Sequence, residues 1–257
     1  MKILNLLLLT FICLTLQAQK NTKREWYEMR IYQYATAEQG ATLDAFLEKA
    51  LLPALHRRGV RLIGVFQAIA NDTALVKKTY LLIPYPSPDV RMKTEEKLLS
   101  DKIFLTDGSA YLDAPYDKPP YTRMETILLQ AFRLAPEMQL PRLTGPRESR
   151  VYELRSYESA TEKIYRNKVE MFNEGGEIPL FERLGFNAIF YADVISGPKM
   201  PNLMYMTSFA DKADRDAHWK TFSADPEWKK LSSMPKYQRN VSKVDITFLR
   251  PTAYSDY

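Results

Sequence analysis

Hydrophobic and polar residues alternate along residues 27–34, which is the two-residue period of a β-strand. Apolar residues then recur every three to four positions from Leu43 to Leu55, and this spacing predicts an amphipathic helix that ends at Gly59. The rest of this region is predicted as strand, turn, strand, polar helix and strand, at residues 61–70, 71–72, 75–85, 89–99 and 124–132. Residues 101–121 interrupt the pattern and are predicted to form an irregular loop that carries aromatic residues.

The second half of the chain repeats this order of elements. Its predicted elements are a strand at 152–157, a helix at 163–184, strands at 187–195 and 203–209, helices starting at Asp211 and Asp225, and a strand at 241–249. Each half therefore follows the β-α-β-β-α-β order of the ferredoxin-like motif. We predict an α+β protein with one unit at 26–132, a proline-containing linker at 133–150 and a second unit at 151–250.

Three sequence matches support a duplication of about 125 residues. Residues 27–36 match residues 152–161 at six of ten positions without a gap. Pro53 and Gly59 recur as Pro179 and Gly185, and residues 79–83 align with 204–208. Repeats of this length are long enough for each unit to own a hydrophobic core.

The N-terminal residues are predicted to be a signal peptide. Lys2 is followed by an apolar run from Ile3 to Leu16, which is too short to span a bilayer comfortably, and Ala18 offers a small residue for cleavage. We therefore expect residues 1–18 to be removed, and the mature protein to be periplasmic or secreted with no stable membrane insertion. Cys13 lies inside the apolar run, a position that does not suit lipidation.

Composition narrows the function classes further. The 257 residues are 46% hydrophobic and 26% charged, which is ordinary for a globular protein and excludes collagen-like, disordered and multi-span membrane classes. Removal of Lys2 and Cys13 lowers the formal net charge from +5 to +4 and leaves no cysteine. The mature chain then has no disulfide and no thiol nucleophile, and its spread charges predict no nucleic-acid partner.

The first strand of each unit carries its charged residues on one side only. Because side chains alternate across a strand, we expect the apolar side to meet the helices and the polar sides of the two sheets to enclose a polar interior. Three roles are open for the charged residues of these strands. They form a structural Glu–Arg pair that bridges the two sheets, they line a ligand cavity, or they face solvent. The candidate cavity-lining residues are Glu28, Arg30, Tyr32, Glu153, Arg155 and Tyr157, together with the strand tyrosines Tyr191 and Tyr205.

Three segments of the second unit resemble the NIPSNAP domain: Tyr-Glu-Leu-Arg-Ser-Tyr at 152–157, the stretch 179–185, and Ala-Asp-Pro-Glu-Trp at 224–228. The resemblance covers 151–250 and, in weaker form, 26–132, where only residues 100–104 stand near the place of the Asp-Pro-Glu-Trp stretch. It implies a dimeric α/β barrel of two ferredoxin-like sheets packed face to face. With both units in one chain, the expected assembly is a monomeric pseudo-dimer or a homodimer.

The same resemblance relates the chain to barrels that include antibiotic-biosynthesis-type monooxygenases and haem-binding proteins such as chlorite dismutase. The NIPSNAP family has no established common reaction, and its better-studied members are linked to mitochondrial and vesicle-associated interactions. It therefore transfers no catalytic residue to this chain.

The two histidines offer little for a metal or a haem. His56 ends the first long helix, where a cationic side chain suits the helix dipole. Asp211, Asp214 and His218 could share a helix face, but we interpret Asp211 as a helix cap and predict no metal and no cofactor. The common motifs of hydrolases, metalloproteases, kinases and dinucleotide-binding proteins are also absent from the sequence.

Three hypotheses for function remain. The first is an exported small-molecule-binding or protein-interaction module whose barrel interior takes an apolar or aromatic molecule. The second is a cofactor-independent oxygenase or isomerase that uses Glu28 and Arg30, or Glu153 and Arg155, with a neighbouring tyrosine for acid–base chemistry. The third is a structural cell-envelope protein with a filled barrel. The sequence leaves open whether the protein is an enzyme.

Overall fold

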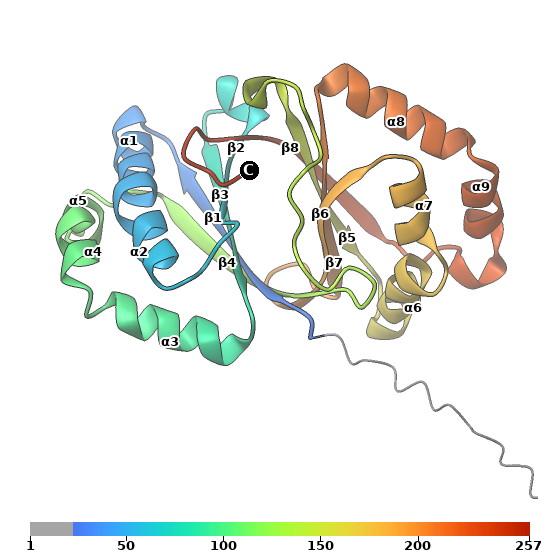
Figure 1. The fold of residues 1–257 in the computed structure, drawn as a ribbon, viewed down its shortest axis with the longest axis horizontal. Helices are drawn as coiled ribbons and strands as arrows, with labels where there is room; N and C mark the ends of the chain where they lie inside the picture. The colour runs from blue at the N-terminus through green and yellow to red at the C-terminus, as the bar shows by residue number, and fades with distance from the viewer. Residues whose placement is uncertain (1–22) are drawn as a thin grey trace, which may run out of the picture.

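The computed structural model describes residues 23–257, so the predicted signal peptide lies outside the described part of the chain. Within that part, no helix is both long enough and apolar enough to cross a membrane. The chain folds into one barrel of strands with helices on two opposite sides (Figure 1).

The first half contains the predicted β-α-β-β-α-β order. Its elements are β1 (Trp26–Tyr34), α1 (Ala37–Phe46), a π-helical segment (Leu47–Leu51), α2 (Leu52–Arg57), β2 (Gly64–Ala68), a 3-10 turn (Ile69–Asp72), β3 (Lys77–Tyr85), α3 (Pro88–Leu98), α4 (Lys102–Asp107), α5 (Ser109–Leu112) and β4 (Arg123–Ala131). Thr36 begins α1 with a capping box to Gln39, and Gly59 follows α2 with a φ of +80°. The predicted irregular loop at 101–121 is wrong in part, because α4 and α5 lie within it, α4 being capped by Asp101.

The second half repeats the order with more helix. After a 3-10 turn (Arg147–Ser149), its elements are β5 (Val151–Glu158), α6 (Glu162–Asn173), α7 (Glu177–Arg183), β6 (Asn187–Ser196), β7 (Asn202–Phe209), α8 (Lys212–Ala224), α9 (Pro226–Ser233), a 3-10 turn (Pro235–Tyr237) and β8 (Lys243–Pro251). The single helix predicted over 163–184 is wrong, because Gly176 adopts the left-handed conformation at φ +92° and separates α6 from α7.

The strands close into a barrel in the order β1-β3-β2-β8-β5-β7-β6-β4. Each half supplies four neighbouring strands in ferredoxin-like order, and antiparallel pairing of β2 with β8 and of β4 with β6 joins the two halves. Helices α1–α5 cover one side of the barrel, and helices α6–α9 cover the other (Figure 1). The predicted architecture, two ferredoxin-like units closed as a barrel within one chain, is confirmed.

The strand pairing corrects one of the three sequence matches. Tyr80 lies opposite Ile31, whereas Met204 lies opposite Ser156, so the structural counterpart of Tyr80 is Met204 rather than Tyr205. The alignment of residues 79–83 with 204–208 is therefore wrong by one position. Because neighbouring strand residues face opposite sides, this slip places Tyr80 inside the barrel and Tyr205 against the helices.

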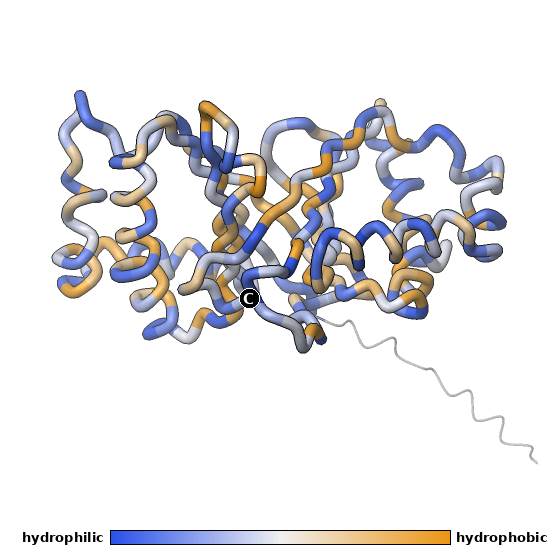
Figure 2. Tube along the Cα trace, turned by 90° about the horizontal axis from the view of Figure 1, so that it is seen from above, coloured by the Kyte–Doolittle hydropathy of each residue, from blue (hydrophilic) through white to orange (hydrophobic). Residues whose placement is uncertain are grey.

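The interior of the barrel is largely apolar, contrary to the predicted polar interior. Tyr27 and Met29 of β1 pack there with Tyr152 and Leu154 of β5, and the surrounding strands add further apolar side chains. Figure 2 shows the hydrophobic positions along the central strands. The charged residues of both first strands face the helices instead. The prediction failed because it assumed purely apolar helix faces, while α3 and α8 carry arginines that neutralise the buried carboxylates.

Candidate functional site

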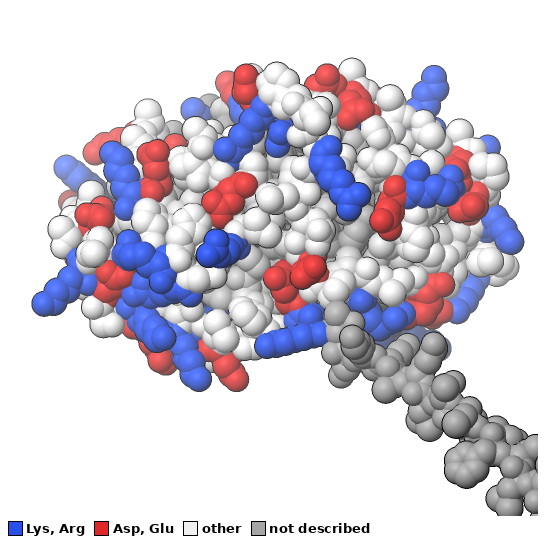
Figure 3. Space-filling model, in the orientation of Figure 1, with Lys and Arg blue, Asp and Glu red and all other residues white. Residues whose placement is uncertain are grey.

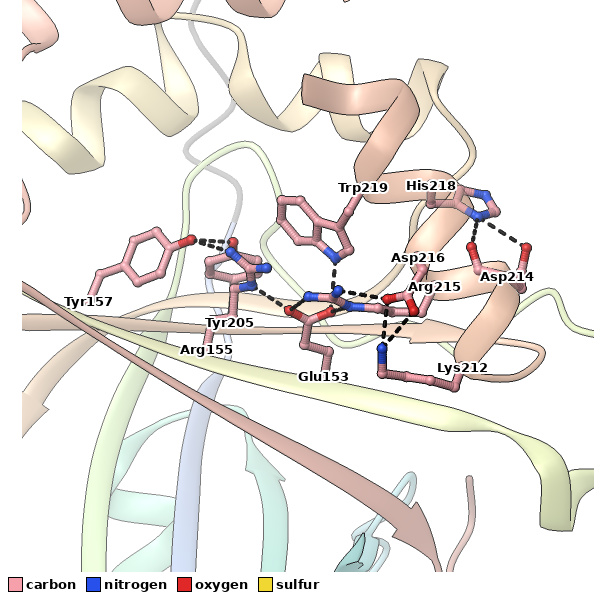
Figure 4. A network of polar contacts seen from close by, with 10 residues as sticks. All are labelled: Glu153, Arg155, Tyr157, Tyr205, Lys212, Asp214, Arg215, Asp216, His218 and Trp219. Atoms are coloured by element: carbon pink, nitrogen blue, oxygen red, sulfur yellow. Dashed lines mark hydrogen bonds and ion pairs between the residues drawn. The ribbon is translucent and has the colours of Figure 1, made fainter. Parts of the chain in front are cut away.

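A buried ionic network lies between β5 and α8 in the second half (Figure 4). The side chain of Glu153 is fully buried, and its carboxylate accepts hydrogen bonds from three side chains. Arg155 Nε donates to it at 2.6 Å, Arg215 Nε and Nη2 donate at 2.7 and 2.9 Å, and Trp219 Nε1 donates at 2.8 Å. Both carboxylate oxygens are thus saturated by protein donors.

The network continues from Arg155 to two phenols. Arg155 Nη1 donates to the Tyr157 hydroxyl at 2.9 Å, and the hydroxyls of Tyr157 and Tyr205 lie 2.9 Å apart. The guanidinium of Arg155 also stacks on the indole of Trp219, 3.6 Å from the ring centroid. Four members of this network, Glu153, Arg155, Tyr157 and Tyr205, are among the predicted cavity-lining residues, but they lie on the helix side of the sheet.

The surroundings of Glu153 and Tyr205 shift the pKa values of both side chains. Burial of Glu153 by itself would raise its pKa, but the hydrogen bonds from Arg215 and the charge of Arg155 outweigh it and lower the pKa below its usual value. Burial raises the pKa of the Tyr205 hydroxyl well above its usual range, with a further contribution from Tyr157. Glu153 therefore stays ionised and Tyr205 stays protonated near neutral pH.

The first half contains a related but different cluster. Glu28 accepts from Arg30 Nε at 2.7 Å and from Arg91 at 2.8 and 3.0 Å, which mirrors Glu153 with Arg155 and Arg215. Burial would raise the pKa of Glu28, but the bonds to Arg91 and the charge of Arg30 lower it overall. Arg30 has a second carboxylate partner, Glu95, in the position that Trp219 occupies in the second half.

Tyr32 differs from its counterpart Tyr157. Leu81 lies opposite Arg30 where Tyr205 lies opposite Arg155, so no second phenol is available across the strands. The buried Tyr32 hydroxyl has no hydrogen-bond partner among residues 23–257, and its ring packs edge-on against Tyr121. The two halves have therefore diverged in polarity at the same place in the fold.

Sequence reasoning missed the helix-borne members of both clusters, Arg91, Glu95, Arg215 and Trp219. One signal could have found the arginines, because each lies four residues after the N-cap of its helix, Ser87 and Asp211. Arg91 and Arg215 therefore occupy equivalent positions on α3 and α8, on the same face of each helix.

Among the predicted site residues, Tyr191 lines an open groove. The groove has a volume of about 410 Å³ and lies between the linker after β4 and the segment from α7 to β6. Its apolar walls include Leu134, Pro136, Leu140, Ile178, Phe186 and Ala188, and its polar lining includes Glu137, Arg142, Glu182 and Tyr191. We call this the linker groove.

Tyr191 connects the linker groove to the buried network. Its ring stacks on Tyr205, with ring centroids 5.6 Å apart, and burial raises the pKa of its hydroxyl, with further contributions from Glu177 and Glu182. The side chain is 3% exposed, and its phenol therefore stays neutral near neutral pH.

Neither histidine lines the linker groove, although the ring of His218 packs edge-on against Phe186 of its wall, with ring centroids 5.5 Å apart. His56 Nε2 lies 3.0 Å from Asp256, and His218 Nδ1 lies 3.0 Å from Asp214. Asp211 caps α8 by accepting from the Asp214 amide, as predicted. Among residues 23–257, no three His, Cys, Asp or Glu side chains are grouped to hold a metal ion.

The barrel and its two helical layers define a protein of the dimeric α/β-barrel class with both halves in one chain. Residues 152–256 match the family model of NIPSNAP, so the predicted resemblance to the NIPSNAP domain is confirmed over that part of the chain. The weaker resemblance of residues 26–132 stays a prediction. A comparison with curated proteins found no match.

Three solved structures share the whole fold at low sequence identity. They are a protein from Lactobacillus acidophilus proposed to be a monooxygenase (12% identity, TM-score 0.58, 89% of this chain and 94% of that one), a second proposed monooxygenase from Fusobacterium nucleatum (6%, 0.57, 90% and 93%), and an anthrone oxidase-like protein (10%, 0.53, 90% and 93%). These likenesses establish the fold and leave the reaction open.

Proposed function

We propose that the protein is an exported small-molecule-binding protein whose ligand occupies the linker groove. The observation that carries this proposal is the linker groove itself, an open volume of about 410 Å³ with apolar walls and with Tyr191 among its lining residues. Ligand sites are commonly concave, mostly apolar and supplied with a few polar groups that orient the ligand. The barrel interior, where the sequence placed the ligand, is largely filled by side chains and is a poorer candidate.

The lining favours an apolar or aromatic ligand of moderate size. A cavity of 150 Å³ accommodates benzene, so 410 Å³ corresponds to about 16 non-hydrogen atoms. Glu137 and Glu182 on one hand and Arg142 on the other supply charges of both signs, which suits a ligand with a polar group rather than a strongly charged one. Charges of both signs are also interspersed over the face in Figure 3, without a single-sign patch for a polyanion.

The neutral fluorescent probe N-phenyl-1-naphthylamine, which has 17 non-hydrogen atoms, tests the groove directly. We expect saturable binding that Ala188→Trp, which fills the groove, weakens at least tenfold. Ala213→Trp on the exposed start of α8 adds the same ring outside the groove and should leave binding unchanged. Equal binding by both variants would remove the groove as the site.

Native mass spectrometry of the protein purified from its own host tests whether the site is occupied in the cell. A reproducible mass above the denatured mass would support a carried ligand and would identify its chemical class. A bare chain that also fails to bind the probe would contradict a small-molecule role.

Export and assembly are part of the proposal. Cleavage after Ala18 should leave Gln19 as the first residue, which an intact mass of protein from the cell envelope or medium measures. Because the barrel closes within one chain, we propose a monomeric pseudo-dimer, and light scattering at the mass of one chain would agree. Twice that mass would favour the homodimer.

A cofactor-independent oxygenase remains the alternative, and it rests on the fold shared with the two proposed monooxygenases and the anthrone oxidase-like protein. Glu153 and Arg155 are poor acid–base groups for it, since their hydrogen-bonding capacity is taken up by protein partners. Among the predicted site residues, Tyr191 lines the groove and is the group that this alternative would use for proton transfer. Dioxygen uptake with an anthrone, abolished by Tyr191→Phe, would favour this alternative over a carrier.

A further inference from the structure

A second, smaller cavity lies inside one end of the barrel. Its volume is about 70 Å³, and residues of β1, β3, β4, β5, β7 and β8 line it, so both halves of the chain contribute. Apolar side chains, including Ile127, Leu154 and Met204, form its inner wall. It is separate from the linker groove, with which it shares no lining residue.

The cavity contains a buried polar group that the protein leaves unpaired. The side chain of Asn202 is 2% exposed, and its Nδ2 donates to Ser156 Oγ at 2.7 Å. Its Oδ1 has no hydrogen-bond partner within residues 23–257. A buried acceptor without a partner is destabilising, so a group that donates to Oδ1 would be bound favourably.

Two hydroxyls face the same space and extend the polar side of the cavity. Tyr80 comes from β3 and Thr247 from β8, and both line the cavity beside Asn202. The lining thus combines apolar side chains with uncharged hydrogen-bonding groups.

The hairpin between β6 and β7 covers the cavity and is latched to β8. Lys199 Nζ lies 2.5 Å from Asp245 Oδ2, and both residues line the cavity. Lys199 has a φ of +65°, a left-handed conformation that is unfavourable for a residue other than glycine. Gly197 of the same turn packs on Ile127, where an added Cβ would come within 3.0 Å.

The charges at the cavity are already paired. Asp245 is paired with Lys199, and Glu125 accepts from Arg123 Nε at 3.1 Å. An ion entering the cavity would have to displace one of these partners, whereas a neutral molecule would not.

We propose that this cavity is a binding site for a small neutral hydroxyl compound of the short-chain alcohol class, oriented by Asn202 and enclosed by the Lys199–Asp245 latch. The hydroxyl donates to Asn202 Oδ1, and the alkyl part lies against Ile127 and Met204. On the benzene scale, 70 Å³ corresponds to about three non-hydrogen atoms, the size of ethanol. A ligand of that size binds with a dissociation constant in the millimolar range, about 1 mM at best.

Methyl NMR with ethanol as the probe tests the site. We expect saturable chemical-shift changes at the methyl groups of Met204 and Ile127, while the exposed Met92 on α3 shows only the linear effect of solvent. Xenon, which has no hydroxyl, measures the apolar wall alone. Saturation by xenon but not by ethanol, or by neither, would overturn the proposal.

Two pairs of variants separate the polar group from the latch. Asn202→Leu should raise the ethanol dissociation constant at least tenfold and leave xenon binding in place. Thr247→Val should raise the same constant several-fold, and it serves as the test if Asn202→Leu does not fold. Lys199→Gly suits the left-handed backbone and removes the latch, so ethanol exchange should become faster. Arg239→Gly is the matched control, because Arg239 has a φ of +58° and lies outside the cavity. Unchanged ethanol affinity in both Asn202→Leu and Thr247→Val would refute the assigned orientation.

Discussion

The two Glu–Arg clusters allow one substitution to be compared at equivalent positions of the same protein. Glu153→Gln removes the charge that compensates Arg155 and Arg215 and leaves one acceptor oxygen where the carboxylate has two. The amide NH₂ of the new side chain then faces the donors of an arginine or of Trp219. Breaking a buried pair by removing one partner destabilises a protein by about 3–5 kcal/mol.

Glu28→Gln should be less harmful. Arg30 keeps its second carboxylate partner, Glu95, and Arg91 is about one-third exposed, so water can solvate it. The expected loss is about 2 kcal/mol, the value of hydrogen bonds to a charged group. The two substitutions should therefore differ by about 2 kcal/mol, which is a difference of about 4–8 °C in the melting temperature of a domain of this size.

Thermal and urea unfolding of the two variants measures this difference. Glu96→Gln on the exposed side of α3 serves as the control, with a change of about 0.5 kcal/mol or less. Equal losses for Glu28→Gln and Glu153→Gln, or a larger loss for Glu28→Gln, would refute the reasoning that the second carboxylate protects the first half.

The remaining predictions follow from burial and from backbone conformation. The pKa values of Glu28 and Glu153 are lowered in the folded protein, so the stability that both carboxylates contribute is complete above their unfolded value near 4.5. This stability falls as the pH drops toward the folded pKa values. Unfolding measured between pH 7 and pH 3 should therefore show a smaller loss of unfolding free energy with falling pH in Glu153→Gln than in the unmodified protein. Lys168→Met should destabilise the protein by about 3–5 kcal/mol because it leaves Glu177 buried and unpaired at a site where the two lie 2.7 Å apart, and the double variant Lys168→Met/Glu177→Leu should recover most of this in urea unfolding. Gly176→Ala should lower stability by about 1 kcal/mol through backbone strain alone, since nothing lies within 4 Å of the added methyl group.

Particular residues show where sequence reasoning succeeded. The alternation at 27–34, the N-caps of the later helices and the Asp225–Pro226 start of α9 are local signals, and the structure confirms each of them. The helix prediction over 163–184 failed at Gly176 because a single left-handed glycine ends a helix without disturbing the apolar spacing around it.

The sequence predicted the polar residues of the candidate site but not the side of the sheet on which they lie. Glu153, Arg155, Tyr157 and Tyr205 were named among eight cavity-lining candidates, and the structure places these four on the helix side of the sheet rather than inside the barrel. Tyr191 was named for its strand position alone, and no local pattern indicates that the linker after β4 leaves a groove beside it.

The sequence by itself determined the duplication, the order of elements, the ferredoxin-like units and the resemblance to the NIPSNAP domain. These features follow from local periodicity, capping and repetition, which a chain carries in any fold. Only the tertiary structure decided which face of each sheet turns inward, because a two-residue period distinguishes two faces without saying what will cover them. That choice depends on arginines of α3 and α8 that lie about sixty residues from the carboxylates they neutralise, and on closure of both sheets into one barrel whose interior is largely filled by apolar side chains.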